Sequence, residues 1–252
     1  MKVLLKKELR EVWRTRRFLI VVAILFVFGL IGPLTVKYMP LILTEVPGVP
    51  EGLADVMPEP DVAMAVDEYV QNLSQLGVIL AILVPMGAVV SEKKSGTAAM
   101  VLSKPVSRVA FLGAKWVLYS FVFLVGIFIA GLGGYYYLGV LFEWLEPLSF
   151  LALNGLVVIY LMMFLAITLF TSSICPSQLA AAGSSFGVLI ILGFVGMISS
   201  ISPYLPAALI RWGRELALQQ SAEAAWGALA ITVLMIGVTC MGSWLIFRNQ
   251  EL

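Results

Sequence analysis

Long runs of uncharged, mostly apolar residues alternate with short polar segments along the chain. A helix needs roughly 20 apolar residues to cross the hydrocarbon core of a bilayer, and the runs are of about that length. The pattern therefore predicts an all-α integral membrane protein with six transmembrane helices. The predicted spans are residues 18–37, 73–91, 116–142, 149–174, 178–199 and 224–247.

One uncharged stretch is too long for a single helix and must hold the fourth and fifth spans. The sequence CPSQ at residues 175–178 is the expected turn, because Pro176 ends a helix and the polar side chains after it can bond the freed backbone groups. The fifth span carries Gly183 and Gly187, with Phe186 between them. Small residues at this spacing favour a tight contact with another helix or another subunit, so these three residues are candidates for a dimer interface.

A basic segment, residues 1–17, precedes the first span. Leu5, Leu9, Val12 and Trp13 recur in it at helical spacing, and its Lys and Arg side chains supply a polar side. The pattern predicts an amphipathic helix in the headgroup plane, with basic side chains drawn to anionic lipid. A solvated flank that only sets the topology is an equal alternative.

Two further polar segments lie between spans. Residues 38–72 are acidic, lack Lys and Arg and hold five prolines, although residues 61–75 are expected to form a helix leading into the second span. This loop either binds cations or is a translocated loop without basic residues, and the second interpretation is favoured because acidic residues weigh little in topology. Residues 200–223 alternate apolar and polar side chains at nearly helical spacing, which predicts an interfacial or re-entrant extracellular helix before the sixth span.

Composition supports a membrane protein and excludes several classes of function. Of the 252 residues, 61% are hydrophobic and 12% charged, whereas a soluble domain has about 25% charged residues; the mean hydropathy is +1.01. With no histidine and only two cysteines, the chain lacks the ingredients of a His-based catalytic triad or a transition-metal site. We therefore expect no catalytic site and no cofactor bound by this chain. The net charge of +1 is spread over loops, which argues against a nucleic-acid partner.

Basic residues are concentrated in alternate loops. The N-terminal segment, residues 92–115, the turn at 175–178 and the C-terminus together hold 13 of the 16 Lys and Arg residues. The opposite loops hold only Lys37, Arg211 and Arg214. The positive-inside rule therefore places both termini and residues 92–115 in the cytoplasm.

The interiors of the predicted spans contain no Asp, Glu, Lys or Arg. Ion-coupled secondary transporters commonly carry such residues within the membrane and are built from repeated halves. No internal repeat is evident in this sequence. The driving energy is therefore expected to come from a cytoplasmic partner that acts on a cytoplasmic element.

Residues 92–115 are the natural choice for that element. They begin with charged residues, continue with a Gly–Thr pair that permits a turn and a helix cap, and then hold an apolar centre and a proline that stops the element. The apolar centre can insert between helices of a partner while the charged residues surround the contact. Composition alone favours the alternative, an ordinary basic loop between two spans, and it is the order of the residues, described next, that favours coupling. The candidate coupling residues are Glu92, Lys93, Lys94, Gly96, Thr97, Met100, Leu102, Pro105, Ser107 and Arg108.

The order of these residues resembles a motif in the membrane subunits of type-2 ABC exporters, in which E-x-x-x-G-T is followed by a leucine-rich stretch and S-x-P-x-S-R. The resemblance covers the whole chain in outline, from the basic N-terminal helix to the element before the sixth span. In that family the segment after the second span forms a coupling helix that docks in a cleft of a separate ATPase. Ala98, Ala99 and Met100 stand where bulkier or acidic residues are usual in the family.

The resemblance implies a permease subunit of the cell inner membrane that pairs with a second copy or a related chain. Two ABC ATPase subunits would bind ATP and Mg and drive export of an amphipathic or hydrophobic substrate, such as a drug, a peptide antibiotic or a lipid-linked molecule. The path would lie at the subunit interface near spans one, two and five. The residues also leave open a scaffold or regulatory subunit that transports nothing, and a self-sufficient channel or secondary transporter.

Overall fold

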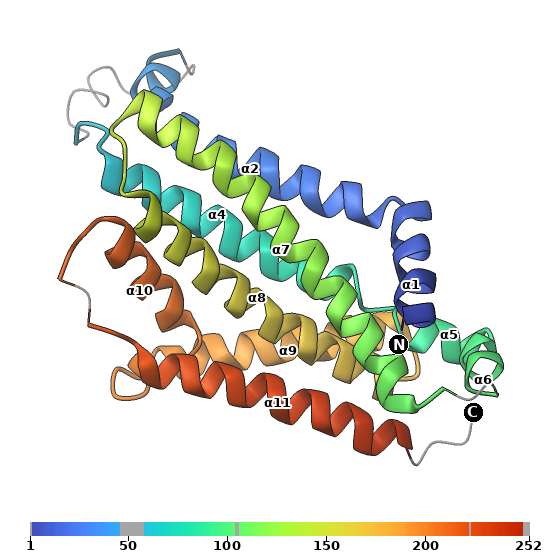
Figure 1. The fold of residues 1–252 in the computed structure, drawn as a ribbon. Helices are drawn as coiled ribbons and strands as arrows, with labels where there is room; N and C mark the ends of the chain where they lie inside the picture. The colour runs from blue at the N-terminus through green and yellow to red at the C-terminus, as the bar shows by residue number, and fades with distance from the viewer. Residues whose placement is uncertain (1, 46–57, 104–105, 222, 249–252) are drawn as a thin grey trace.

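A computed structural model describes residues 2–45, 58–103, 106–221 and 223–248, and every element in these ranges is helical (Figure 1). The expected all-α class is therefore confirmed. The elements are α1 (Lys2–Arg14), α2 (Arg17–Glu45), α4 (Val62–Leu83), α5 (Val90–Lys94), α6 (Thr97–Leu102), α7 (Arg108–Leu141), α8 (Pro147–Ile174), α9 (Gln178–Gly196), the 3-10 helix η1 (Ser202–Tyr204), α10 (Ala207–Ala217) and α11 (Trp226–Arg248).

Five helices in the described part of the chain are long and apolar enough to cross a membrane, namely α2, α7, α8, α9 and α11. α4 is not among them, because Asp67, Glu68 and neighbouring amide side chains lower the hydropathy of its first half. Several membrane-spanning helices are thus established, and the sixth span stays a prediction.

α8 lies at the centre of the bundle, where it contacts α4, α5, α7, α9, α10 and α11 (Figure 1). α2 packs along α7 and α4 on one side. Burial inside the chain falls from 61% in the most apolar part of α8 to 17% in α9 and 11% in α11. α9 and α11 therefore keep wide apolar faces that suit lipid or another subunit.

Small residues let the helices approach closely. α2 crosses α4 at Gly32, where a Cβ atom would lie 2.9 Å from the Tyr69 backbone, so a larger residue would push the two helices apart. The Tyr69 hydroxyl donates to Asn154 Oδ1 of α8 at 2.7 Å, and Asn154 Nδ2 donates to the Phe150 carbonyl at 2.9 Å. These bonds satisfy polar groups inside an apolar core and connect α4 to α8.

α2, which contains the first predicted span, extends beyond the end predicted for that span. α2 continues through Pro33 and Pro40 to Glu45, past the predicted end at residue 37. An apolar run in a membrane keeps its backbone groups bonded internally, and a helix can do so even when a proline removes one donor. The central part of the predicted acidic loop, residues 46–57, lies outside the described residues.

α4 begins where the sequence predicted a helix that leads into the second span. The Asp61 carboxylate caps α4 by accepting from the Met64 backbone N–H at 2.7 Å. α4 ends at Leu83, and Pro85 lies in the turn before α5. The chain therefore bends as it leaves α4, as expected for a proline.

The two ends of the bundle differ in construction. α1, α5 and α6 gather at one end, together with the start of α7 and the end of α11 (Figure 1). α10, the helix expected within residues 200–223, packs against α8 and α4 toward the other end. There Arg214 pairs with Asp67 through two hydrogen bonds, of which Nη2 to Oδ2 is 2.9 Å.

Candidate functional site

Residues 92–102, the core of the predicted coupling segment, form a compact helix–turn–helix at the end of the bundle. α5 and α6 are joined at Gly96, whose φ of +71° lies in the left-handed region that favours glycine. The hydroxyls of Ser95 and Thr97 are 2.8 Å apart across this turn. The turn expected at Gly96 is therefore present, and it folds α6 back beside α5.

Glu92 points inward from α5 rather than toward solvent, with 8% of its surface exposed. Its Oε1 accepts from Lys115 Nζ of α7 at 2.6 Å and from Lys7 Nζ of α1 at 2.5 Å. Lys115 is 1% exposed and also donates to both carboxylate oxygens of Glu8, at 2.9 and 3.0 Å. Lys7, Glu8, Glu92 and Lys115, named the charge cluster below, thus join α1, α5 and α7.

The charges within the cluster balance. Burial alone would raise the pKa of the Glu92 carboxyl, but the ammonium groups of Lys115 and Lys7 outweigh burial and hold this pKa below its ordinary value. Burial alone would lower the pKa of Lys7, but its hydrogen bonds to Glu92 and Glu8 raise it above the ordinary value. Both groups therefore stay charged around neutral pH.

The cluster is better suited to ion pairing than to metal binding. Glu8, Glu11 and Glu92 offer carboxylate oxygens within 4.8 Å of one another. However, the ammonium groups of Lys7 and Lys115 already bond Glu8 and Glu92 and supply the positive charge that a cation would bring. Glu92 Oε2 is buried without a hydrogen-bond partner among the described residues, so the cluster keeps one unused acceptor.

α1 buries a stripe of side chains that includes a glutamate. Leu4, Glu8 and Val12 are buried, whereas Leu9 is 48% and Trp13 63% exposed. The apolar spacing located Val12 correctly, but it gave no sign that a glutamate would occupy the buried face. Leu9 and Trp13 remain available to lipid, as a helix in the headgroup plane requires.

The start of α5 is also bonded to the end of α8 and the start of α9. Ser172 Oγ accepts from the backbone N–H groups of Val89 and Val90 at 3.1 and 3.3 Å. Lys93 Nζ donates to the Ser173 carbonyl at 3.0 Å, and Gln178 Nε2 donates to Ser91 Oγ at 2.7 Å. Apolar periodicity does not reveal bonds of this kind. The signal in the sequence for a contact here was the polar run around residues 172–178.

α6 presents one apolar side chain outward and packs the others. Met100 is 70% exposed, and Lys94 and Gly96 on the preceding turn are exposed as well. Val101 and Leu102 are half-buried against a small apolar cluster. The buried members of that cluster are Val89, Ala98, Phe111 and Phe247. Met100 and the turn are thus the accessible part of the segment.

The far end of the segment is anchored to α11. Ser107 Oγ caps α7 by accepting from the Ala110 N–H at 3.1 Å. Arg108 Nη1 donates to the carbonyls of Phe247 and, at 2.8 Å, Arg248. Pro105, the predicted stop, lies outside the described residues. Of the predicted residues, Glu92, Lys93, Thr97, Ser107 and Arg108 therefore make internal bonds.

The predicted dimer-interface residues fall on two sides of α9. A Cβ atom at Gly183 or Gly187 would meet no described atom within 4 Å, so both glycines lie on an uncovered face. Phe186 is half-buried and packs against the main core.

Comparison with known proteins agrees with this architecture. A family model described as ABC-2 family transporter protein matches residues 2–252. The chain is also 28% identical to the uncharacterized transmembrane protein YxlG of Bacillus subtilis (strain 168), over 254 aligned positions that cover 100% of this chain and 98% of YxlG. Because the family match spans nearly the whole chain, this protein belongs to the ABC-2 family of membrane transport proteins.

Proposed function

We propose that this chain is the permease subunit of an ATP-driven exporter, in which two permease chains pair and two separate ATPase subunits bind ATP and Mg²⁺. Membership of the ABC-2 family supports the permease role. The observation that carries the proposal is the construction of α5 and α6. α5 is bonded to α1, α7, α8 and α9, while Met100 of α6 stands 70% exposed at the end of the bundle.

In this proposal the exposed turn receives the motion of the ATPase and the inner bonds distribute it. A displacement of α5 acts on α7 through Glu92 and Lys115, on α1 through Lys7, and on α8 through Ser172. The unused Glu92 Oε2 offers the two ammonium groups a second acceptor when α5 shifts, so the ion pairs can change partners within the cluster without breaking. The cluster thus transmits displacement while its charges stay paired.

Docking is tested by changing the outward residue and sparing the inner ones. Met100→Asp should lower the affinity for the ATPase at least about fivefold, because we place Met100 at the centre of the contact, where hot-spot side chains contribute more than about 1 kcal/mol. The matched control is Gln219→Asp, at an exposed turn after α10. ATP hydrolysis is measured with the ATPase subunits that co-purify from native membranes. Equal stimulation by both variants would contradict docking at Met100.

The proposed orientation, with α1, α5 and α6 in the cytoplasm, is supported by the distribution of basic residues in the sequence. The predicted span interiors hold no ionisable residue, which suits an amphipathic or hydrophobic substrate better than an inorganic ion. ATP-dependent uptake into inverted membrane vesicles tests direction and substrate class together. A strict requirement for a small inorganic ion would argue against this substrate class, and ion conductance by the isolated chain would support a channel. A co-purifying ATPase without any transport would support a regulatory subunit.

Pairing of two permease chains is proposed through the uncovered face of α9. Gly183→Cys, in a background with Cys175→Ser and Cys240→Ser, should form a disulfide between two chains in native membranes. Leu132→Cys on α7, 59% exposed in the single chain, is the control and should not cross-link. Cross-linking at Leu132 but not at Gly183 would place the contact elsewhere.

A further inference from the structure

The outer side of α1 carries basic and apolar side chains around a shallow hollow of about 650 Å³. The hollow is lined by Lys6, Leu9, Arg10, Trp13 and Arg14, and all five side chains are exposed. Lys6, Arg10 and Arg14 follow one another at intervals of four residues. Residues at this spacing are neighbours on a helix, so the three basic side chains form one stripe beside the two apolar ones.

The acidic side chains of α1 are held on its other side. Lys7 Nζ is 2.9 Å from Glu8 Oε1 and 3.8 Å from Glu11 Oε2, and Glu8 also pairs with Lys115 of α7. The three basic side chains of the hollow, by contrast, make no ion pair with a carboxylate in the described part of the chain. The outer side of α1 is therefore a cationic surface whose counter-charge comes from outside the chain.

The position of α1 places this surface at the edge of the membrane. Figure 1 shows α1 standing across the end of the bundle, at a steep angle to the membrane-spanning helix α2 that follows it. The Trp13 ring stacks on Phe18, the first uncharged residue of α2, with ring centroids 5.4 Å apart. Tryptophan is enriched at the boundary between headgroups and acyl chains. The hollow thus lies at the level of the lipid headgroups, with its apolar side chains next to the start of a span.

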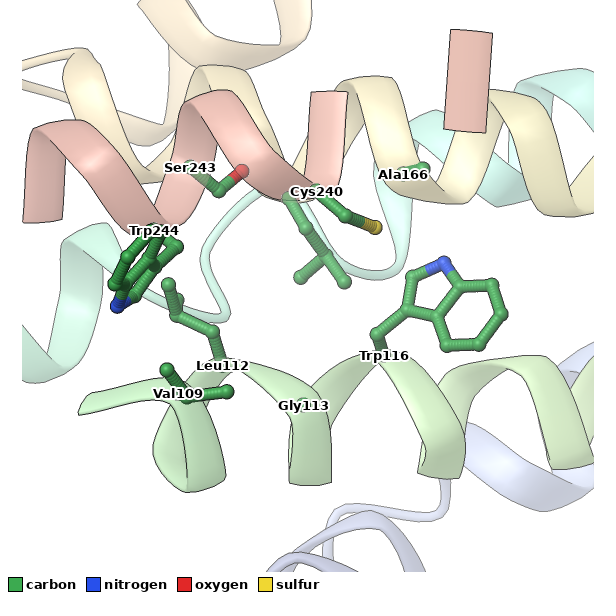
Figure 2. A pocket seen from close by; sticks show the side chains of 9 residues that line it. Val109, Leu112, Gly113, Trp116, Ala166, Cys240, Ser243 and Trp244 are labelled. Atoms are coloured by element: carbon green, nitrogen blue, oxygen red, sulfur yellow. The ribbon is translucent and has the colours of Figure 1, made fainter. Parts of the chain in front are cut away.

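Charge distinguishes this hollow from the apolar one between α7, α8 and α11, toward the same end of the bundle (Figure 2). Figure 2 shows Trp116, Cys240 and Trp244 around that second hollow, and none of the described side chains that line it is charged. Such walls accept any apolar group, so they select no particular occupant. Basic side chains beside Leu9 and Trp13 select an amphiphile with an anionic head.

We propose that the outer side of α1 binds anionic phospholipid of the surrounding bilayer, and that this lipid holds α1 in place against the charge cluster. The headgroup phosphate pairs with the three basic side chains, while the upper parts of the acyl chains contact Leu9 and Trp13. The opposite side of α1 supplies Lys7 and Glu8 to the charge cluster, which also holds Glu92 of the coupling segment. The lipid thus regulates coupling, a role that rests on the proposed function, whereas lipid binding and the attachment of α1 do not.

Lipid binding is measured on the full-length protein. The protein is stripped of lipid in detergent and titrated with phosphatidylglycerol or with phosphatidylcholine of the same acyl chains, and bound lipids are counted by native mass spectrometry. The unmodified protein should bind phosphatidylglycerol at least about tenfold more tightly, because the basic side chains attract the anionic headgroup. An excess of soluble glycerophosphoglycerol should not compete, since it lacks acyl chains. Effective competition by this headgroup would overturn a bilayer lipid as the ligand.

Two double variants locate the binding surface. Arg10→Gln with Arg14→Gln should bring the affinities for the two lipids close to each other. Lys37→Gln with Arg211→Gln removes the same charge elsewhere and should keep the preference. All four residues are exposed, so neither pair is expected to disturb folding. An equal preference for phosphatidylglycerol in both double variants would overturn the site, and a loss of ATPase affinity without a loss of lipid binding in the first pair would assign this side of α1 to the ATPase instead.

Amide hydrogen exchange tests whether the lipid holds α1 in place. Exchange in α1 and α5 is measured by mass spectrometry in phosphatidylcholine nanodiscs with and without phosphatidylglycerol. Phosphatidylglycerol should slow exchange in both helices of the unmodified protein, but not in the variant with Arg10→Gln and Arg14→Gln. Equal exchange of the unmodified protein in both lipids would overturn the attachment. This measurement needs no ATPase, so it stands even when the proposed function fails. ATPase stimulation in the same nanodiscs should rise with phosphatidylglycerol, and stimulation that is equal in both lipids would overturn the regulation of coupling.

Discussion

Replacing Lys115 with methionine tests whether the charge cluster holds the coupling segment in place. Lys115 Nζ makes three hydrogen bonds to carboxylate oxygens, two to Glu8 and one to Glu92. Lys115→Met keeps much of the side-chain volume but leaves two buried carboxylates to share Lys7, which is 31% exposed. The cluster then carries a net negative charge inside the protein.

The expected loss follows from the cost of an uncompensated buried charge. Removing one partner of a buried pair costs roughly 3–5 kcal/mol. Lys7 still neutralises part of the charge, so we expect about 3 kcal/mol. A chain of this size loses about 2–4 °C of Tm per kcal/mol, which predicts a decrease of roughly 6–12 °C. Adding Glu8→Gln restores neutrality and should recover about half of the loss.

Thermal unfolding is followed by tryptophan fluorescence in lipid nanodiscs, with ATPase stimulation measured on the same samples. Lys94→Met is the control, because Lys94 is exposed on the same segment and its replacement should change stability by no more than about 0.5 kcal/mol. The reasoning is refuted if Lys115→Met has the same Tm as the Lys94→Met control. It is also refuted if adding Glu8→Gln to Lys115→Met lowers the Tm further instead of raising it.

Three further predictions concern pH, the turn and the core. Because the pKa of Glu92 is lowered, its stabilising effect is present above the ordinary carboxyl pKa and is lost as pH falls below about 4.3. Because the pKa of Lys7 is raised, its stabilising effect is lost only as pH rises beyond about 10.4. Titration of Glu92 and Lys7 should therefore cause no step in ATPase stimulation between pH 6 and 9, and a step traced to either residue would contradict the assignment. Gly96→Val should lower the free energy of unfolding by about 1–2 kcal/mol and abolish the stimulation of ATP hydrolysis, because only the positive φ restricts this open site. Gly96→Asn should retain most of the stimulation, since asparagine tolerates positive φ. Equal loss of stimulation in both variants would point to a steric role for Gly96. Tyr69→Phe should lower the free energy of unfolding by about 1–3 kcal/mol, because Asn154 Oδ1 is then buried without its donor. An unchanged Tm would show that another donor reaches Asn154 Oδ1.

The sequence predicted the helical class and the polar segment, because apolar runs and turn residues are local signals. Gly96 is an example: a glycine between a charged segment and a short apolar one predicts a turn without reference to the rest of the chain, although the side chain of Thr97, expected to supply a helix cap, makes no capping bond to α6. The direction of the Glu92 side chain, by contrast, is set by residues far away in the sequence, so no local signal predicts it. The prediction placed it around the partner contact, whereas its carboxylate lies inside, because Lys7 and Lys115 approach from distant parts of the sequence.

The apolar spacing also did not indicate which side of α1 the protein covers. It groups Leu9, Val12 and Trp13, whereas the protein buries Glu8 with Val12 and leaves Leu9 and Trp13 exposed, as a helix in the headgroup plane requires. In a membrane protein, exposed apolar side chains have lipid as a partner, so hydrophobicity does not identify the face turned toward the protein. The uncovered glycines of α9 pose the same difficulty, since the sequence motif does not distinguish a contact within the chain from one between chains.

The charge cluster also constrains the biogenesis of the protein. Glu8 and Lys115 are 107 positions apart, so the ribosome releases α1 long before its main partner on α7 emerges. Until then, Glu8 can be paired only locally, and α1 rests on the membrane surface without its final attachment. Truncated chains that end before residue 115 would therefore expose an unfastened basic helix, a feature that membrane quality-control proteases could use to distinguish incomplete chains from finished ones.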